Sequence, residues 1–158
     1  MKENNRLTSF NLPSTKNNIF KSKNIKNKFL VVYFYPKDLT SGCTLQAKDF
    51  SKNYKLFKKN NCEIIGISAD NLDSHKKFKK KIKIPFELLS DKKKKIIMKF
   101  KAWGKKSMYG KSFFGIRRTT YLIDPNKKII KIWKNVKVKN HVKEVLKTLI
   151  INKRNFFL

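Results

Sequence analysis

The chain has 158 residues and a formal net charge of +30, with 40 lysines and arginines against 10 aspartates and glutamates. Apolar residues make up 40% and aromatic residues 13% of it, which is enough for a folded core and argues against a disordered chain. Two cysteines are too few for a disulfide framework, and no run approaches the roughly 18 apolar residues of a membrane span. We therefore expect a cytoplasmic protein without a membrane partner, folded as one domain over 1–158 with loose ends at 1–8 and 151–158.

The positive charge is carried by 36 lysines and only 4 arginines. Lysine has AT-rich codons and arginine mostly GC-rich ones. A coding bias toward AT therefore explains much of the lysine excess, and of the positive charge, without any binding partner. A lysine-rich protein that binds nucleic acid is the alternative interpretation. The lysine runs at 76–83 and 92–95 fall within expected helices, and we interpret them as solvated faces.

The first half of the chain alternates predicted strands and helices. Residues 1–28 are mostly polar and predict an extended arm or a small hairpin, whereas 29–35 form an apolar run typical of a buried central strand. An apolar stripe with helical spacing then predicts a helix from Thr44 to about Lys59, and the next strand follows at 62–68.

The second half continues this alternation. Capping groups at 70–73 begin a helix that runs to about 83, a short strand follows at 86–89, and a short helix at 92–100. Residues 103–115 contain three glycines and predict a loop. Strands at 118–124 and 129–134 flank a Pro-Asn turn, and a last helix begins near Asn140. This order predicts an α/β fold whose central sheet is parallel at first, ends in an antiparallel hairpin and has helices on both faces.

Cys43 is the residue with the clearest chemical potential, because it follows the central strand and opens the first helix. Free N–H groups and the dipole at a helix N-terminus stabilise a thiolate, the nucleophilic form of cysteine. Thr40 can turn its hydroxyl toward the sulfur or a bound oxygen, and Pro36 shields one side. Cys43 lies outside the predicted apolar stripe, which favours a redox nucleophile over a small buried core residue.

The segment Tyr-Phe-Tyr-Pro-Lys-Asp-x-Thr-x-Gly-Cys-Thr, residues 33–44, resembles the active-site segment of the peroxiredoxins, and in particular their bacterioferritin comigratory protein or peroxiredoxin Q branch. Further segments fall in the family's order over about residues 8–150: Phe10-x-Leu-Pro13, Gly66-Ile-Ser-x-Asp70, Leu88-Leu-Ser-Asp91, Trp103-Gly-x-Lys-Ser107, Gly110-Lys111 and Gly115-Ile-x-Arg-x-x-x-Leu-Ile-Asp124.

This resemblance implies a thioredoxin-like fold and a thiol-specific peroxidase without a metal or cofactor. The thiolate of Cys43 would attack hydrogen peroxide or an organic hydroperoxide and become a sulfenic acid. Arg118 matches the family's active-site arginine, and Arg117 is the competing choice, since neighbours on a strand point to opposite faces. A thiol–disulfide oxidoreductase is a weaker alternative, because it would need a Cys-x-x-Cys motif that Cys43 lacks.

Many members of this branch carry a resolving cysteine five residues after the first, where this chain has Lys48. Cys62 is the only other thiol, and a helix of about 16 residues would separate the two cysteines by roughly 24 Å. A disulfide needs Cα atoms within about 7 Å, so we interpret Cys62 as structural. The sequence thus predicts a one-cysteine cycle in which an external thiol, such as thioredoxin, reduces the enzyme as a monomer or weak dimer.

Two other groups of residues invite a functional interpretation. His75 and His141 have no second ligand at metal spacing, so we expect solvated surface histidines rather than a metal site. The resemblance implies that Trp103, Phe113 and Phe114 help to wall the active site, although packing of the core or loop explains them equally well.

Overall fold

A central five-stranded sheet organises the fold, in a computed structural model that describes residues 1–157. Its strand order is β5-β4-β3-β8-β9. The strands are β3 (Phe29–Phe34), β4 (Cys62–Ser68), β5 (Glu87–Ser90), β8 (Thr119–Ile123) and β9 (Ile129–Trp133). β3 pairs in parallel with β4, and β4 with β5, whereas β8 is antiparallel to both β3 and β9. The prediction of a parallel sheet that ends in an antiparallel hairpin is confirmed.

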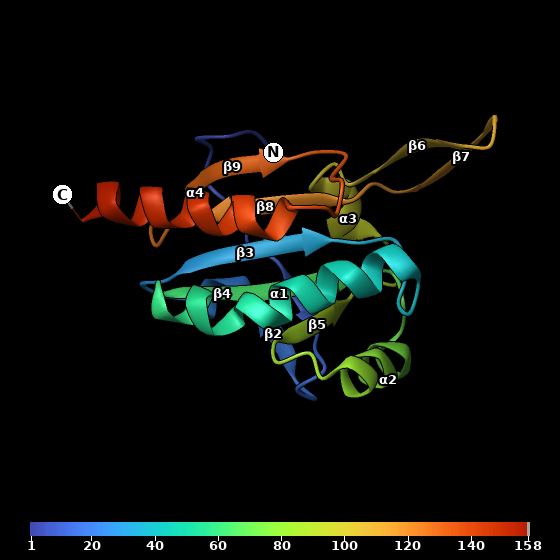
Figure 1. Cartoon of the computed structure of the whole chain (residues 1–158), viewed down its shortest axis with the longest axis horizontal. Helices are drawn as coiled ribbons and strands as arrows, with labels where there is room; N and C mark the ends of the chain where they lie inside the picture. Colours follow the sequence, from blue (N-terminus) through green and yellow to red (C-terminus); the bar gives the residue numbers. More distant parts are fainter. Residues whose placement is uncertain (158) are drawn as a thin grey trace.

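Helices cover both faces of the sheet, as the sequence predicts (Figure 1). All six residues of β3 are buried, and alternate side chains enter two different hydrophobic clusters. The cluster on one face includes side chains from α1 (Ser41–Lys59), α2 (Leu72–Ile82) and α4 (His141–Phe156). The other includes α3 (Lys95–Lys99) and the N-terminal segment. Within residues 1–157, no helix is long and apolar enough to cross a membrane.

The N-terminal segment forms a small hairpin, in agreement with the sequence. Its strands are β1 (Asn11–Pro13) and β2 (Ile19–Lys21), and a short 3₁₀ helix, η1 (Ser22–Asn24), follows them. Near the N-terminus, the amides of Asn4 and Leu7 donate to the carbonyls of Ile129 and Lys127, and α4 continues to Phe156.

The prediction of a loop over 103–115 is wrong. The segment forms two antiparallel strands, β6 (Trp103–Met108) and β7 (Lys111–Ile116), in a hairpin that extends away from the body of the molecule (Figure 1). Tyr109 and Gly110, with φ angles of +53° and +75°, make the tight turn. The glycines therefore allow a tight hairpin turn and close packing. The lysines between them interrupt the alternation of apolar and polar residues by which a strand is recognised in a sequence.

Candidate active site

Cys43 lies in the first turn of α1, directly beyond the end of β3. Its side chain is 1% exposed. The expectation that it lies outside the apolar stripe is wrong, because the four-residue spacing to Ala47 puts both side chains on the same buried face of α1. The thiol is thus enclosed by the core at the N-terminal turn of the helix.

Sheet register brings Arg118 to Cys43. Phe34, the last residue of β3, is paired with Thr119, the first residue of β8, so the residue before Thr119 reaches the same edge of the sheet. The Arg118 Nη1 atom donates to the Cys43 Sγ atom over 3.5 Å. Gly42 leaves room for this approach, because a Cβ atom there would lie 3.1 Å from Arg118 Nη2. A permanent positive charge therefore lies beside the sulfur.

Arg117, the competing candidate, occupies a different place. Its backbone N–H donates to the carbonyl of Ala102, and its guanidinium packs so closely against Gly104 that a side chain there would overlap it. Arg117 therefore packs against the base of the β6–β7 hairpin. Of the two arginines, Arg118 is the one in contact with Cys43.

Gln46 is a site residue that the sequence analysis missed. Its Oε1 atom accepts a hydrogen bond of 2.7 Å from Arg118 Nη1, the same atom that contacts Cys43 Sγ. Gln46 is fully buried, and its Nε2 atom has no hydrogen-bond partner among the described residues. The signal was available, because a residue three positions after Cys43 lies on the same face of a helix.

Two further groups lie in the electrostatic environment of Cys43. Burial, followed by the charge of Cys43, raises the pKa of Tyr33, whose hydroxyl is buried without a partner among the described residues. Lys106, from the hairpin, donates to the Ile116 carbonyl over 2.9 Å. Burial and the charge of Arg118 lower the pKa of Lys106, while Cys43 acts in the opposite direction. Lys106 is the lysine of the Trp103-Gly-x-Lys-Ser107 segment, to which the sequence analysis assigned no role in the site.

Thr40 and Pro36 flank the loop between β3 and α1. The Thr40 hydroxyl donates to the Lys37 carbonyl over 2.9 Å. Because that bond uses its proton, the Thr40 oxygen retains lone pairs that can accept a hydrogen bond from a ligand. Pro36 is half-buried directly after the strand, where its missing N–H group ends the pairing with the neighbouring strand.

Cys62 lies at the opposite edge of the sheet. It is the first residue of β4 and is paired with Phe29, at the beginning of β3, whereas Cys43 follows the end of β3. Both thiols are free and 1% exposed. Burial raises the pKa of Cys62 well above its ordinary value, and its Sγ atom donates to the Glu63 carbonyl over 3.4 Å. Cys62 is therefore buried at the other end of β3 from Cys43.

The expectation that both histidines are solvated is wrong. His141 is 4% exposed, its Nε2 atom lies 2.8 Å from Thr120 Oγ1, and burial lowers its pKa to about 4. His75 is 0% exposed, and it lies beside two carboxylates. Both rings fill space between helices and the sheet, which the lysine-rich surroundings in the sequence concealed.

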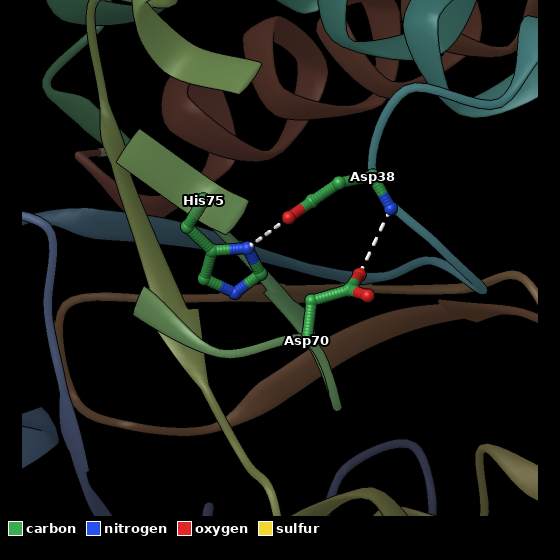
Figure 2. Close-up of side chains that lie close together, drawn as sticks. All are labelled: Asp38, Asp70 and His75. Atoms are coloured by element: carbon green, nitrogen blue, oxygen red, sulfur yellow. Dashed lines mark hydrogen bonds and ion pairs between the residues drawn. The ribbon is translucent and has the colours of Figure 1, made fainter. Parts of the chain in front are cut away.

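Asp38, Asp70 and His75 each place a potential metal ligand within 4.8 Å of the others (Figure 2). These atoms are already engaged, however. The His75 Nδ1 atom lies 2.7 Å from Asp38 Oδ2, and Asp70 Oδ2 accepts the Asp38 N–H over 2.8 Å. A metal ion would have to displace these contacts, so the donor set fits a hydrogen-bond network better than a metal centre.

Comparisons with known proteins agree with this arrangement. The AhpC/TSA family profile matches residues 4–132. Peroxiredoxin Bcp of Bacillus subtilis (strain 168) is 46% identical over 129 residues, which are 82% of each chain. A mutant of Xylella fastidiosa PrxQ has a TM-score of 0.91 at 31% identity, covering 96% of this chain and 97% of its own. The Xanthomonas campestris bacterioferritin comigratory protein, studied for alkyl peroxide reduction, has a TM-score of 0.86 at 33% identity, over 91% and 92%.

These relatives and a mixed sheet with a cysteine at a helix N-terminus and an arginine in contact with its sulfur together identify a thiol peroxidase. The chain belongs to the AhpC/TSA family, in the Bcp and peroxiredoxin Q branch of the peroxiredoxins. It is an oxidoreductase that reduces a peroxide at the expense of a thiol.

Proposed function

We propose that Cys43 is the peroxidatic nucleophile and that an external thiol completes a one-cysteine cycle. The observation that carries the first half is the hydrogen bond from Arg118 Nη1 to the sulfur in the first turn of α1. An ionised sulfur at this point is stabilised by the guanidinium and by the helix N-terminus together.

In the oxidation step, the Cys43 thiolate attacks one oxygen of a hydroperoxide. A sulfur–oxygen bond forms, the oxygen–oxygen bond breaks, and the departing oxygen takes the electron pair and a proton to leave as water or an alcohol. Arg118 stabilises the negative charge that spreads over both oxygens, and Thr40 accepts a hydrogen bond from the peroxide. Pro36 shields one side of the site.

In the reduction step, one external thiol condenses with the sulfenic acid to give a mixed disulfide and water, and a second thiol releases Cys43. This assignment is supported by the place of Cys62 at the other edge of the sheet and by its raised pKa. It is supported also by Lys48, exposed on α1, at the position where many members of the branch carry their resolving cysteine. Thioredoxin is the reductant that we propose first.

We extend the proposal to the setting of the enzyme. It acts in the cytoplasm as one domain over residues 1–158, as a monomer or weak dimer. A net charge of +30 opposes close approach of two copies at low salt, in keeping with this state.

The test compares two single variants that differ only in which thiol is lost. Cys43→Ser abolishes peroxide consumption with dithiothreitol or thioredoxin as the reductant, whereas Cys62→Ser retains it. Mass spectrometry after one equivalent of peroxide shows a gain of one oxygen at Cys43. An intramolecular Cys43–Cys62 disulfide would contradict the one-cysteine cycle, and activity in Cys43→Ser would contradict the nucleophile.

A further inference from the structure

The loop that joins β3 to α1 has a conformation that its own sequence does not favour. Leu39 has a φ angle of +65°, in the left-handed region that is costly for a residue with a branched side chain. Its side chain is 47% exposed, so core packing does not hold it there. Thr40 follows directly and caps α1, and the orientation of the first turn with Cys43 therefore depends on this strained residue.

Asp38, the residue before Leu39, anchors the loop. It is 5% exposed, and its carboxylate accepts hydrogen bonds from Tyr35 Oη over 2.6 Å and from Ser74 Oγ over 2.7 Å. Its backbone N–H donates to Asp70 Oδ2 over 2.8 Å. These bonds attach Asp38 to the chain just after β3, to the chain just after β4, and to α2.

His75, from α2, also contacts the Asp38 carboxylate. Its Nδ1 atom lies 2.7 Å from Asp38 Oδ2 (Figure 2). Its Nε2 atom lies 2.8 Å from the Leu89 carbonyl oxygen. A carboxylate and a carbonyl both accept, so each ring nitrogen of His75 lies against an acceptor. The two side chains are 0% and 1% exposed, which makes a buried ion pair between α2 and the loop. Burial raises the pKa of Asp38, but the hydrogen bond and charge of His75, together with the hydrogen bonds from Tyr35 and Ser74, outweigh this and hold the pKa below its ordinary value.

We propose that Asp38 and His75 are positioning residues for the peroxidase reaction. Their ion pair, together with the hydrogen bond from Tyr35 to Asp38, clamps the loop so that Leu39 stays in its left-handed conformation and the first turn of α1 presents Cys43 to the peroxide beside Arg118. Neither residue has a hydrogen bond to the sulfur. The inference deepens the proposed function, because it rests on Cys43 as the nucleophile.

The experiment weakens the clamp and measures Cys43 directly, in a Cys62→Ser background so that only one thiol reacts. Tyr35→Phe removes one hydrogen bond to Asp38, and Asp38→Asn removes the charge. Tyr54→Phe is the matched control, because Tyr54 donates a similar bond of 2.7 Å to Glu63, which follows Cys62 at the far edge of the sheet. For each variant, three quantities are measured: the second-order rate constant of Cys43 oxidation by hydrogen peroxide, the rate of Cys43 alkylation by a maleimide, and the thermal midpoint.

We expect Asp38→Asn to lower the oxidation rate constant on the order of 100-fold and Tyr35→Phe on the order of 10-fold, because a small displacement of a reacting group is costly. Alkylation becomes faster in both, since the released loop exposes a thiol that is 1% exposed when the clamp is closed. Tyr54→Phe changes only the thermal midpoint. A purely structural role for Asp38 would likewise lower the midpoint and leave both rates unchanged.

The outcomes separate the two proposals. Activity that survives in Cys43→Ser removes the proposed function itself. If oxidation depends on Cys43 but its rate constant in Tyr35→Phe equals that in Tyr54→Phe, only the clamp is wrong. Because Tyr35→Phe removes a single hydroxyl, this comparison holds even if Asp38→Asn fails to fold.

Discussion

At the scale of single residues, the site depends on contacts between side chains that are far apart in the sequence. Arg118 was expected from its place in a family pattern, and its contact with Cys43 agrees with that expectation. Gln46 could have been found from helical spacing alone. Tyr33 and Lys106 could not have been found in this way, because their approach to Cys43 depends on how β3 and the hairpin pack around α1.

The adjacent arginines permit a sharp test of the electrostatic role. Arg118→Lys keeps the charge, but the lysine side chain is one atom shorter than the path to Arg118 Nη1, so its ammonium group does not reach both Cys43 and Gln46 in the same geometry. We expect the second-order rate constant with hydrogen peroxide to fall on the order of 100-fold. Arg117→Lys is the control, and it stays within about threefold of the parent because its guanidinium packs elsewhere. Equal losses in the two variants would rule out a specific role for Arg118.

At the scale of elements, the β6–β7 hairpin departs most from what the sequence predicts. It contains large apolar side chains that are well exposed, among them Tyr109 at 97% and Phe114 at 67%. Its two strands form a sheet of their own, separate from the central one. Two-stranded ribbons without further pairing are marginally stable, so this element has the least support from its neighbours.

Limited proteolysis tests the stability of this hairpin. We expect trypsin to cleave first after the exposed Lys105 or Lys111, because local opening there costs less than opening a helix of the core. Tyr109→Asn provides the favoured Asn-Gly turn and slows this cleavage, whereas Gly110→Ala, at a φ of +75°, accelerates it. Peptide mass spectrometry at short times identifies the sites. Earlier cleavage within the lysine-rich α2 would contradict the expectation that the hairpin opens more easily than the helices.

At the scale of the whole molecule, the fold accommodates a large excess of positive charge. The described residues contain two lysine–glutamate ion pairs, Lys16 with Glu87 and Lys58 with Glu63, and both lysines are well exposed. Such exposed pairs contribute little to the stability of the folded state. Most of the 36 lysines have no acidic residue to offset their charge. Mutual repulsion of these charges is therefore a general cost to the folded state.

Salt tests this cost directly. Raising sodium chloride from about 0.01 M to about 0.15 M shortens the screening length from about 30 Å to about 8 Å. We expect the free energy of unfolding to rise on the order of 1 kcal/mol, because repulsion among lysines is screened more than the sparse attractions. Urea titrations followed by circular dichroism measure the change. A lower stability at the higher salt concentration would mean that attractive pairs dominate.

The sequence by itself determined which segments form the strands of the central sheet, in chain order, and the identity of the candidate nucleophile. Both depend on local signals: apolar runs, helical spacing and a cysteine placed between a strand and a helix. Only the tertiary structure decided which arginine faces Cys43, that both histidines are buried, and that Asp38 and His75 form an ion pair. Each of these joins residues from separate elements, and the register and packing that bring them together are set by the whole core, which no single segment encodes.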